Sequence, residues 1–557
     1  MVGGEISLPS ENDENKDGKP LGGTERRMWR SRPLALALLL LVLFLFAGIR
    51  WRLRSMPLER DEGEYAYAGQ LILQGIPPYQ LTYNMKLPGT YVAYAAMLRT
   101  FGETAAGVHT GLLLVNGVAT LLMFVLARRL YGDLAGVTAA ASYALLSTSE
   151  VVLGLAGHAT HFVVLMALAG ILLLLSARES KSLAIYVCAG ACMGLAFLMK
   201  QPGVVFVIFG AQEIVWRVWK ESSRSKKLAA RLCAYGAGAA IPYLVTSAAL
   251  YRVGVFGKFW FWTVSYASQY GTSTGLAQGL KYLLAMVPLL FYGAPVVWCF
   301  AAIGLVVVLC ERGKDAVFSF KISLLLWSFA GVSAGLYYRE HYFILMLPAV
   351  SLLAGKAMKW STEQLQQRVQ IKKLSVVPAV LFVAGYGMAL YAQRSDFFVS
   401  SPESVIRHQY GGNPFPEAVE FASYIKQHSE ADAKIAVLGS EPEIYFYAGR
   451  QSATGYIYTY GLMEEQKYAS QMQREMMDEI EKAKPEYVVK VVVATSWLRK
   501  ANSDTTILLW AEKYIGDQYR VVGVADIAMT TTYRWDEQAE GYVPRSRYSM
   551  YLYKRKI

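Results

Sequence analysis

Acidic and basic side chains gather in one segment that follows the first long apolar run of the chain. Asp61, Glu62 and Glu64 lie in residues 51–105, and Lys86 follows after a stretch rich in tyrosine and proline. A carboxylate with a fixed direction can act as a general base, and an ammonium group can bind an anion. These residue types therefore suit acid–base chemistry or anion binding in one loop.

The local spacing places Asp61 at the start of a helix. Asp is a preferred N-cap residue, and Glu64 three positions later completes the pattern of a capping box, so a purely structural role stays open. A capped carboxylate also has a fixed direction, so the two roles are compatible. Apolar residues at helical spacing, followed by helix breakers, predict a short amphipathic helix in the membrane interface: Tyr65, Ala68, Leu71 and Ile72, then Gly75 and Pro77.

Other charged residues are expected at the ends of apolar segments. Lys200 lies in a Lys-Gln-Pro-Gly turn, and Arg339 is followed by Glu340 and His341. Charges near membrane depth are costly, so such residues are candidates for function; snorkelling to lipid headgroups is the alternative. His158 and His161 open a further segment. These two histidines lack the further ligand that a metal needs, so polar packing is the simpler interpretation.

The composition indicates a membrane protein with one water-soluble part. Of 557 residues, 54% are hydrophobic and 17% are charged, whereas soluble domains have about 25% charged residues. The apolar residues are concentrated in a segment that we predict to be a transmembrane domain, residues 33–392. Residues 1–32 read as a disordered cytoplasmic tail, and residues 393–557 as a soluble domain.

The apolar segments predict a polytopic helical protein. A spanning helix needs about 20 apolar residues, and about eleven candidates meet this length. They are residues 33–50, 106–126, 133–149, 159–176, 183–199, 203–219, 230–250, 281–310, 317–337, 342–358 and 375–392. With the N-terminus in the cytoplasm, lysine and arginine concentrate in the cytoplasmic loops. Residues 51–105 then form the first outside loop, and residues 393–557 lie in the periplasm of a bacterial inner membrane.

The placement of the basic residues argues against nucleic acid as a partner. The net charge is +13, but the basic residues occur in short runs beside apolar segments, as in Arg128-Arg129. Topology signals and anionic lipid headgroups explain this placement better than nucleic acid does. We expect membrane lipids as partners and no nucleic acid.

The C-terminal segment alternates helical and strand patterns. Residues 417–427 and 463–483 are predicted helices, and residues 434–438 and 486–493 are predicted strands. The alternation predicts a small sheet covered by helices, an α/β domain.

The order of these residues resembles one known family. Asp61, Glu62 and Tyr65 follow the first apolar segment, and Lys86 and Pro88 precede an aromatic run. This pattern is similar to the first outside loop of the GT-C glycosyltransferases. The protein O-mannosyltransferases (glycosyltransferase family 39) and their bacterial aminoarabinose lipid A transferase relatives are the nearest in pattern. The resemblance implies that Asp61 is the catalytic carboxylate and that Lys86 helps to hold a lipid phosphate.

The resemblance continues along the chain, with two departures. Further matching segments are Arg128-Arg129-Leu130-Tyr131-Gly132, residues 194–201, His341-Tyr342-Phe343 with Leu347-Pro348, and residues 442–450. The aminoarabinose branch has an arginine three residues after its aspartate and an acidic residue before its lysine, where this chain has Glu64 and Met85. The aminoarabinose substrate is therefore in doubt, and the phosphate needs another cation.

The resemblance implies a GT-C-like membrane glycosyltransferase that moves a hexose or pentose from a polyprenyl-phosphate donor to a hydroxyl acceptor. The acceptor would be a lipid, a glycan or a protein on the outer face of the cytoplasmic membrane, and a single base would invert the anomeric centre. Besides Asp61 as base, Lys86, Arg339 and Lys200 are candidates for the donor phosphate. Candidates for substrate contact are Glu62, Glu64, Tyr65, Tyr83, His161, His341 and Tyr342.

Several alternatives remain beside this hypothesis. The tyrosines also suit the aromatic belt of a membrane protein. No cofactor is evident and no metal motif is visible, although some GT-C relatives use a divalent ion. A transporter or flippase of lipid-linked or polar solutes is the rival function, because transporters are also polytopic; their polar residues, however, lie near the bilayer midplane. An inactive scaffold subunit of an envelope polysaccharide complex is a third.

Overall fold

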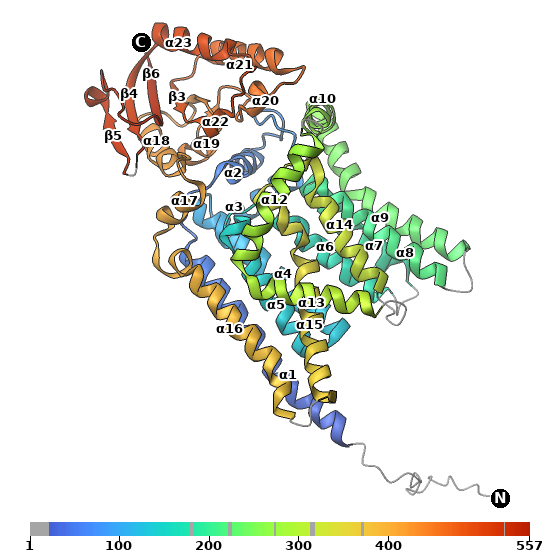
Figure 1. Ribbon diagram of the computed structural model, residues 1–557. Helices are drawn as coiled ribbons and strands as arrows, with labels where there is room; N and C mark the ends of the chain where they lie inside the picture. The colour runs from blue at the N-terminus through green and yellow to red at the C-terminus, as the bar shows by residue number, and fades with distance from the viewer. Residues whose placement is uncertain are drawn as a thin grey trace, which may run out of the picture.

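The computed structural model describes residues 22–177, 182–220, 225–271, 274–311, 318–368, 372–528 and 530–556. Most of the predicted N-terminal tail, residues 1–32, lies outside this range. A bundle of long helices and a domain with a β-sheet lie one above the other, and the first loop of the chain is enclosed between them (Figure 1).

Long apolar helices form the bundle. In the described part of the chain, seven helices are long and apolar enough to cross a membrane, and four shorter apolar helices accompany them. The bundle helices are α1 (Gly22–Arg52), α4 (Ala105–Tyr131), α5 (Asp133–Leu146), α6 (Ala159–Ser176), α7 (Leu183–Met199), α8 (Val204–Lys220), α9 (Ser225–Arg252), α12 (Leu276–Gly293), α13 (Pro295–Cys310), α14 (Phe318–Val332), α15 (Leu347–Arg368) and α16 (Val377–Ala392). Two short helices, α10 (Phe256–Trp260) and α11 (Ala267–Gly271), lie between α9 and α12.

The single span predicted over residues 281–310 is wrong, because two helices meet there at Ala294. One end of α12 packs against the turn at Leu336 and the other against the turn at Val151. Both turns lie on the side of the bundle that faces the sheet, so α12 runs along that side and α13 leads away from it. Pro295 opens α13, where a residue without an N–H donor is well tolerated.

The first loop contains two helices, α2 (Arg60–Leu73) and α3 (Gly89–Phe101). The helix α2 packs against α3 on one side and against α19 (Glu443–Ala448) of the C-terminal domain on the other, and most of its residues are buried. The predicted helix is therefore present, but its predicted location in the membrane interface is wrong. Protein covers α2 on both sides, which a local spacing pattern does not reveal.

The predicted capping box is displaced by two residues. Glu59, not Asp61, is the N-cap of α2, and its side chain accepts a hydrogen bond from the backbone N–H of Glu62. The Glu62 carboxylate in turn accepts from the N–H of Glu59. Because these two side chains satisfy free N–H groups at the helix start, the Asp61 carboxylate is left for other contacts.

The C-terminal domain has the alternation of helices and strands that the sequence predicts. Its elements are α17 (Pro402–Tyr410), α18 (Phe415–Gln427), β1 (Lys434–Leu438), α19, β2 (Gln451–Ser452), α20 (Tyr460–Met463), α21 (Ala469–Ala483), β3 (Tyr487–Val492), α22 (Ala494–Trp497), α23 (Thr506–Gln518), β4 (Tyr519–Asp526), β5 (Thr532–Trp535) and β6 (Ser549–Arg555). The helix predicted over residues 463–483 is α21, which begins six residues later, at Ala469, and ends as predicted; Met463 is the last residue of α20.

The six strands form one mixed sheet in the order β2-β1-β3-β6-β4-β5. The strand β1 is parallel to β2 and β3, whereas β3–β6, β6–β4 and β4–β5 are antiparallel. The apolar side chains on one face of β1 and β3 are buried in the same core as the tyrosines of α2. The sheet domain and the first loop therefore fold around a common core.

The contact between α2 and the C-terminal domain is close. A Cβ atom on Gly63 would lie 2.6 Å from the backbone nitrogen of Glu443, so the two helices approach at a position where only glycine fits. Beside it the ring of Tyr67 stacks on Tyr445 at 5.2 Å, and the Tyr67 hydroxyl accepts a hydrogen bond from the N–H of Ser452. These contacts fix the start of α2 relative to the sheet domain.

Candidate active site

A cavity of about 420 Å³ lies between the bundle and the C-terminal domain. Its walls come from α2 and the chain that follows it, from the turns after α7 and α14, and from the segment between β2 and α21. Of the residues predicted for a site, those that line it are Asp61, Tyr65, Tyr83, Lys86, Lys200, Arg339, His341 and Tyr342. Segments far apart in the sequence thus bring most of the predicted residues to one space.

Asp61 and Lys86 form an ion pair in the wall of this cavity. The Lys86 Nζ lies 2.7 Å from Asp61 Oδ1 and 2.7 Å from Glu64 Oε2. The side chains of Asp61 and Lys86 are 18% and 20% exposed, whereas Glu64 is fully buried. The ammonium group therefore joins a carboxylate that faces the cavity to one that lies behind it.

The charges at the pair favour the ionised forms. Burial alone would raise the pKa of Asp61, but the ammonium group of Lys86 holds it well below its usual range. Burial alone would lower the pKa of Lys86, but Asp61 and Glu64 hold it above its usual range. Both groups are therefore charged at neutral pH.

Glu64 positions Lys86 and does not line the cavity. Its Oε1 accepts a hydrogen bond from the Tyr91 hydroxyl at 2.5 Å, and its Oε2 accepts from the Asn84 amide at 2.8 Å as well as from Lys86. A buried carboxylate with three donors is held in one orientation. The role of Glu64 is thus to fix the ammonium of Lys86.

Two further cations line the cavity from the bundle. Lys200 follows the end of α7, and its Nζ lies 4.3 Å from the ring centroid of Tyr342. Burial lowers the pKa of Lys200 to about 7. The guanidinium of Arg339 lies 5.7 Å from the ring centroid of Tyr337. Together with Lys86 they give the cavity a positive side that suits an anionic ligand.

Two stacked histidines lie beside Asp61. The rings of His158 and His341 are 4.1 Å apart, and His158 Nδ1 lies 4.0 Å from Asp61 Oδ2. Burial lowers the pKa of His158 to about 4, so its ring is neutral at pH 7.

The same three residues could hold a metal ion. Ligand atoms of Asp61, His158 and His341 lie within 4.8 Å of one another, and neutral imidazoles with a carboxylate suit zinc. The sequence offered only the pair His158 and His161, whereas the fold brings Asp61 and His341 to His158. The Lys86 ammonium on Asp61 opposes such a metal, because it neutralises the carboxylate.

Besides Glu64, two predicted substrate contacts lie away from the cavity. The Glu62 carboxylate is fully buried behind α2, where its Oε1 accepts a hydrogen bond from the N–H of Gly157 at 2.6 Å and lies 3.0 Å from His109 Nε2. His161 is buried in the first turn of α6 and is not among the lining residues. Glu62 therefore holds the start of α2, and neither Glu62 nor His161 lines the cavity.

The C-terminal domain contributes side chains to the cavity that were not predicted from the sequence. Tyr456, Tyr458, Tyr460 and Glu464 line the cavity, and the Tyr458 hydroxyl donates a hydrogen bond to Asp61 Oδ1 at 3.1 Å. The three tyrosines occupy every second position up to the first residue of α20, which was the one signal present in the sequence. This spacing does not show what the three side chains face.

The comparisons with known proteins agree with this architecture. Residues 87–253 match the family model described as dolichyl-phosphate-mannose-protein mannosyltransferase. The match begins directly after Lys86, so the assignment of Asp61 and Lys86 rests on the geometry. The search of curated proteins found no match.

Solved structures resemble the whole chain. ArnT from Cupriavidus metallidurans, in a crystal structure with undecaprenyl phosphate, superposes with a TM-score of 0.56 at 16% sequence identity, over 93% of this chain and 97% of that one. The oligosaccharyltransferase AglB from Archaeoglobus fulgidus, solved with an inhibitory peptide and a dolichol-phosphate, has a TM-score of 0.49 at 13% identity, over 93% of this chain and 75% of that one.

The likeness to ArnT extends over both the bundle and the sheet domain. It confirms the predicted fold class, a polytopic helical membrane protein with a small C-terminal α/β domain. The chain thus has the GT-C fold of ArnT, and its residues 87–253 match the model of the dolichyl-phosphate-mannose-protein mannosyltransferases, in agreement with the predicted resemblance.

Proposed function

We propose that this protein is a membrane glycosyltransferase that moves a sugar from a polyprenyl-phosphate donor to a hydroxyl acceptor. The ion pair between Asp61 and Lys86 in the wall of the cavity carries the proposal. A carboxylate and an ammonium group at 2.7 Å offer a proton acceptor and a phosphate ligand in one place.

The cavity suits a phosphate that is attached to a lipid. Lys86, Lys200 and Arg339 supply positive charge, and Met199 and Val205 line the same space beside the apolar helices. A lipid phosphate is already a stable anion, so it needs charge stabilisation rather than a proton when it leaves. The undecaprenyl phosphate bound to ArnT supports this choice of donor.

The reaction follows from the positions of the two charges. Asp61 accepts the proton of the acceptor hydroxyl as its oxygen attacks the anomeric carbon, and the bond to the phosphate oxygen breaks. A phosphate that takes Lys86 as its counter-ion weakens the ion pair and makes the Asp61 carboxylate more basic. One direct displacement inverts the anomeric centre. A positioned base of this kind contributes about 10²–10⁴-fold to a rate.

We place the reaction on the outer face of the cytoplasmic membrane. The excess of lysine and arginine in the loops remote from the sheet favours a cytoplasmic location for that side of the bundle. The cavity and the sheet domain then lie outside, where lipid, glycan and protein acceptors of the cell envelope are available.

The test is a product assay with purified protein in detergent. Undecaprenyl-phosphate-linked hexoses and pentoses are offered as donors, with an envelope extract from a strain that lacks the gene as acceptor. Mass spectrometry follows free undecaprenyl phosphate and the glycosylated product. We expect both with the wild type and neither with Asp61→Asn. Wild-type activity in Asp61→Asn would refute Asp61 as the base.

The same protein in sealed vesicles separates this function from transport. A glycosyltransferase forms a glycosidic product, whereas a flippase moves the lipid-linked sugar across the membrane and leaves it unchanged. Movement of the donor without any product would replace the proposed function by transport.

A further inference from the structure

Tyr458 reaches Asp61 from the other domain. Its hydroxyl donates to Asp61 Oδ1 at 3.1 Å, on the same oxygen that Lys86 contacts at 2.7 Å. The second oxygen, Oδ2, lies 4.0 Å from His158 Nδ1. Because both donors hold Oδ1, they fix the plane of the carboxylate and leave Oδ2 as the oxygen that an acceptor hydroxyl would meet.

Buried hydrogen bonds hold the backbone next to Tyr458. The N–H of Thr459 donates to Ser440 Oγ at 2.9 Å, and the Thr459 hydroxyl donates to the carbonyl of Ser496 at 3.1 Å. The Ser496 hydroxyl donates to Glu441 Oε2 at 2.6 Å. All of these side chains are at most 1% exposed, so Thr459 is fixed to the rest of the domain.

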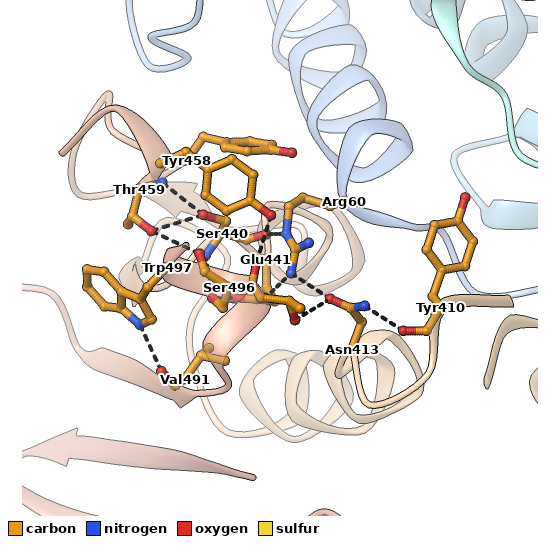
Figure 2. Close-up of polar contacts among 12 residues, drawn as sticks. Arg60, Tyr410, Asn413, Ser440, Glu441, Tyr458, Thr459, Val491, Ser496 and Trp497 are labelled. Atoms are coloured by element: carbon orange, nitrogen blue, oxygen red, sulfur yellow. Dashed lines mark hydrogen bonds and ion pairs between the residues drawn. The ribbon is translucent and has the colours of Figure 1, made fainter. Parts of the chain in front are cut away.

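Arg60 connects this network to α2. Its Nη2 lies 2.8 Å from Glu441 Oε1, and its Nε donates to the carbonyl of Ser440 at 2.5 Å. Figure 2 shows the guanidinium of Arg60 between Glu441 and Asn413, with Thr459 and Tyr458 directly beyond Ser440. Arg60 and Glu441 are almost fully buried, with side chains 8% and 0% exposed.

The contacts close a ring that includes Asp61. From Arg60 it runs through Glu441, Ser496 and Thr459 to Tyr458, whose hydroxyl returns to Asp61, the neighbour of Arg60 in the chain. Breaking a buried ion pair leaves an uncompensated charge, and members of a buried network depend on one another. The position of the Tyr458 hydroxyl is therefore tied to the ion pair at the start of α2.

We propose that Tyr458 is a positioning residue for Asp61, and that the Arg60–Glu441 ion pair holds it there, so that the C-terminal domain completes the active site. This inference rests on the proposed function, because it assigns to Tyr458 the task of orienting the base. It gives the C-terminal domain a direct part in the transfer.

The first test removes one oxygen atom. Tyr458→Phe deletes the hydrogen bond and keeps the ring, so we expect kcat to fall about tenfold with an unchanged KM for the donor, since a hydrogen bond to a charged group is of this size. The acidic limb of the pH–rate profile should move to higher pH, because a hydrogen bond to a carboxylate lowers its pKa. Undecaprenyl-phosphate mannose with the envelope extract serves as the first substrate pair, or whichever donor of the panel proves active.

Tyr542→Phe is the matched control. The Tyr542 hydroxyl donates to Asp526 Oδ2 at 2.9 Å, so the same atom is lost from a similar tyrosine–aspartate contact that does not line the cavity. We expect wild-type kcat and an unchanged pH profile. An equal fall in both variants would overturn the proposal, because a general loss of domain stability would then explain it.

The second test asks whether the ion pair acts through Tyr458. Glu441→Gln keeps the shape but removes the charge. If Glu441→Gln does not fold, Thr459→Val serves instead, because it removes the two hydrogen bonds of the Thr459 hydroxyl, with Ser496 and Ser440, from the same network. We expect each to lower kcat. Combined with Tyr458→Phe, either should add about twofold or less, because residues in one network are not additive. Additive losses would overturn the link between the ion pair and Tyr458.

The outcomes separate this inference from the proposed function. Loss of activity in Asp61→Asn with wild-type kcat and pH profile in Tyr458→Phe refutes the role of Tyr458 alone. Wild-type activity in Asp61→Asn refutes the base itself, and the role of Tyr458 fails with it.

Discussion

Two clusters in the molecule have nearly the same residue types and different surroundings. Asp61, His158 and His341 form one, and Glu150, Asp396 and His408 form the other. In each, one ligand atom from every residue lies within 4.8 Å of the others. We call them the cavity cluster and the hinge cluster, because the second joins the turn after α5 to α17 and to the link that precedes α17.

The difference between the clusters is burial and what lies beside them. The side chain of His158 is 2% exposed, whereas that of His408 is 65% exposed. The cavity cluster borders a space of about 420 Å³ with three cations around it. The hinge cluster is an ion pair of His408 with Asp396 at 3.1 Å, and its residues do not line that space. Similar residue types therefore do not distinguish the two clusters; a cavity lined by Lys86, Lys200 and Arg339 does.

The largest effect should come from the base. We expect Asp61→Asn to lower the transfer rate by about 10²–10⁴-fold, with donor binding retained, because the amide keeps the shape but accepts no proton. His408→Gln in the hinge cluster should leave the rate unchanged. Single-turnover release of undecaprenyl phosphate measures both. Equal losses in the two variants would remove the distinction between the clusters.

The next effect concerns the ammonium group of the cavity. Lys86→Met should lower kcat/KM by a factor that corresponds to about 2–3 kcal/mol of transition-state stabilisation, since a hydrogen bond to a charged group is lost and Glu64 stays buried without its partner. Lys86→Arg keeps the charge and should lose less. Steady-state kinetics with the donor varied gives the result. Identical kinetics in both variants would mean that charge at this position is not needed.

A smaller effect should appear with pH. The pKa of Lys200 is about 7 because the side chain is buried, so its ammonium is present below pH 7 and lost above it. Where this charge binds the donor phosphate, KM should rise with pH above 7, by up to about tenfold per unit as the charged fraction falls. Lys200→Gln should have a high KM without this dependence. A wild-type KM that is flat from pH 6 to 9 would exclude Lys200 as a phosphate ligand.

The smallest effect belongs to the hinge cluster. The hydrogen bond that the His408 ring donates to Asp396, and the negative charge of that carboxylate, raise the pKa of His408. The stability that this contact adds is therefore present at low pH and is lost as pH rises through the raised value. Because His408 is exposed, we expect at most about 1 kcal/mol. Thermal unfolding of wild type and His408→Gln should differ at pH 6 and agree at pH 9. A difference that grows with pH would have the wrong sign.

Local patterns predicted the parts of the site that depend on a single segment. Asp61 and Lys86 lie in one loop after the first apolar helix, so their closeness could be predicted from the sequence. The strand at residues 434–438 begins and ends as predicted. The break at Ala294 was also readable, because Gly293 and Pro295 flank it. The length of the apolar run concealed it.

The missed features depend on distant contacts. Tyr458 meets Asp61 across 397 positions of sequence, and His341 meets His158 only because two turns of the bundle lie side by side. The capping residue was misplaced because Glu59 and Asp61 both suit an N-cap, and only the fold decides which carboxylate turns to the cavity. Such choices depend on packing between domains rather than on spacing in one segment.

The central claim is that Lys86 holds a lipid phosphate next to the Asp61 carboxylate. A cryo-EM structure of the protein in nanodiscs with undecaprenyl phosphate tests it directly. We predict the phosphate oxygens at about 2.7–2.9 Å from Lys86 Nζ, the distance of a charge-assisted hydrogen bond, with the lipid tail leaving along the bundle helices. A phosphate bound on the side of the bundle remote from the sheet, out of reach of Lys86, would contradict the account.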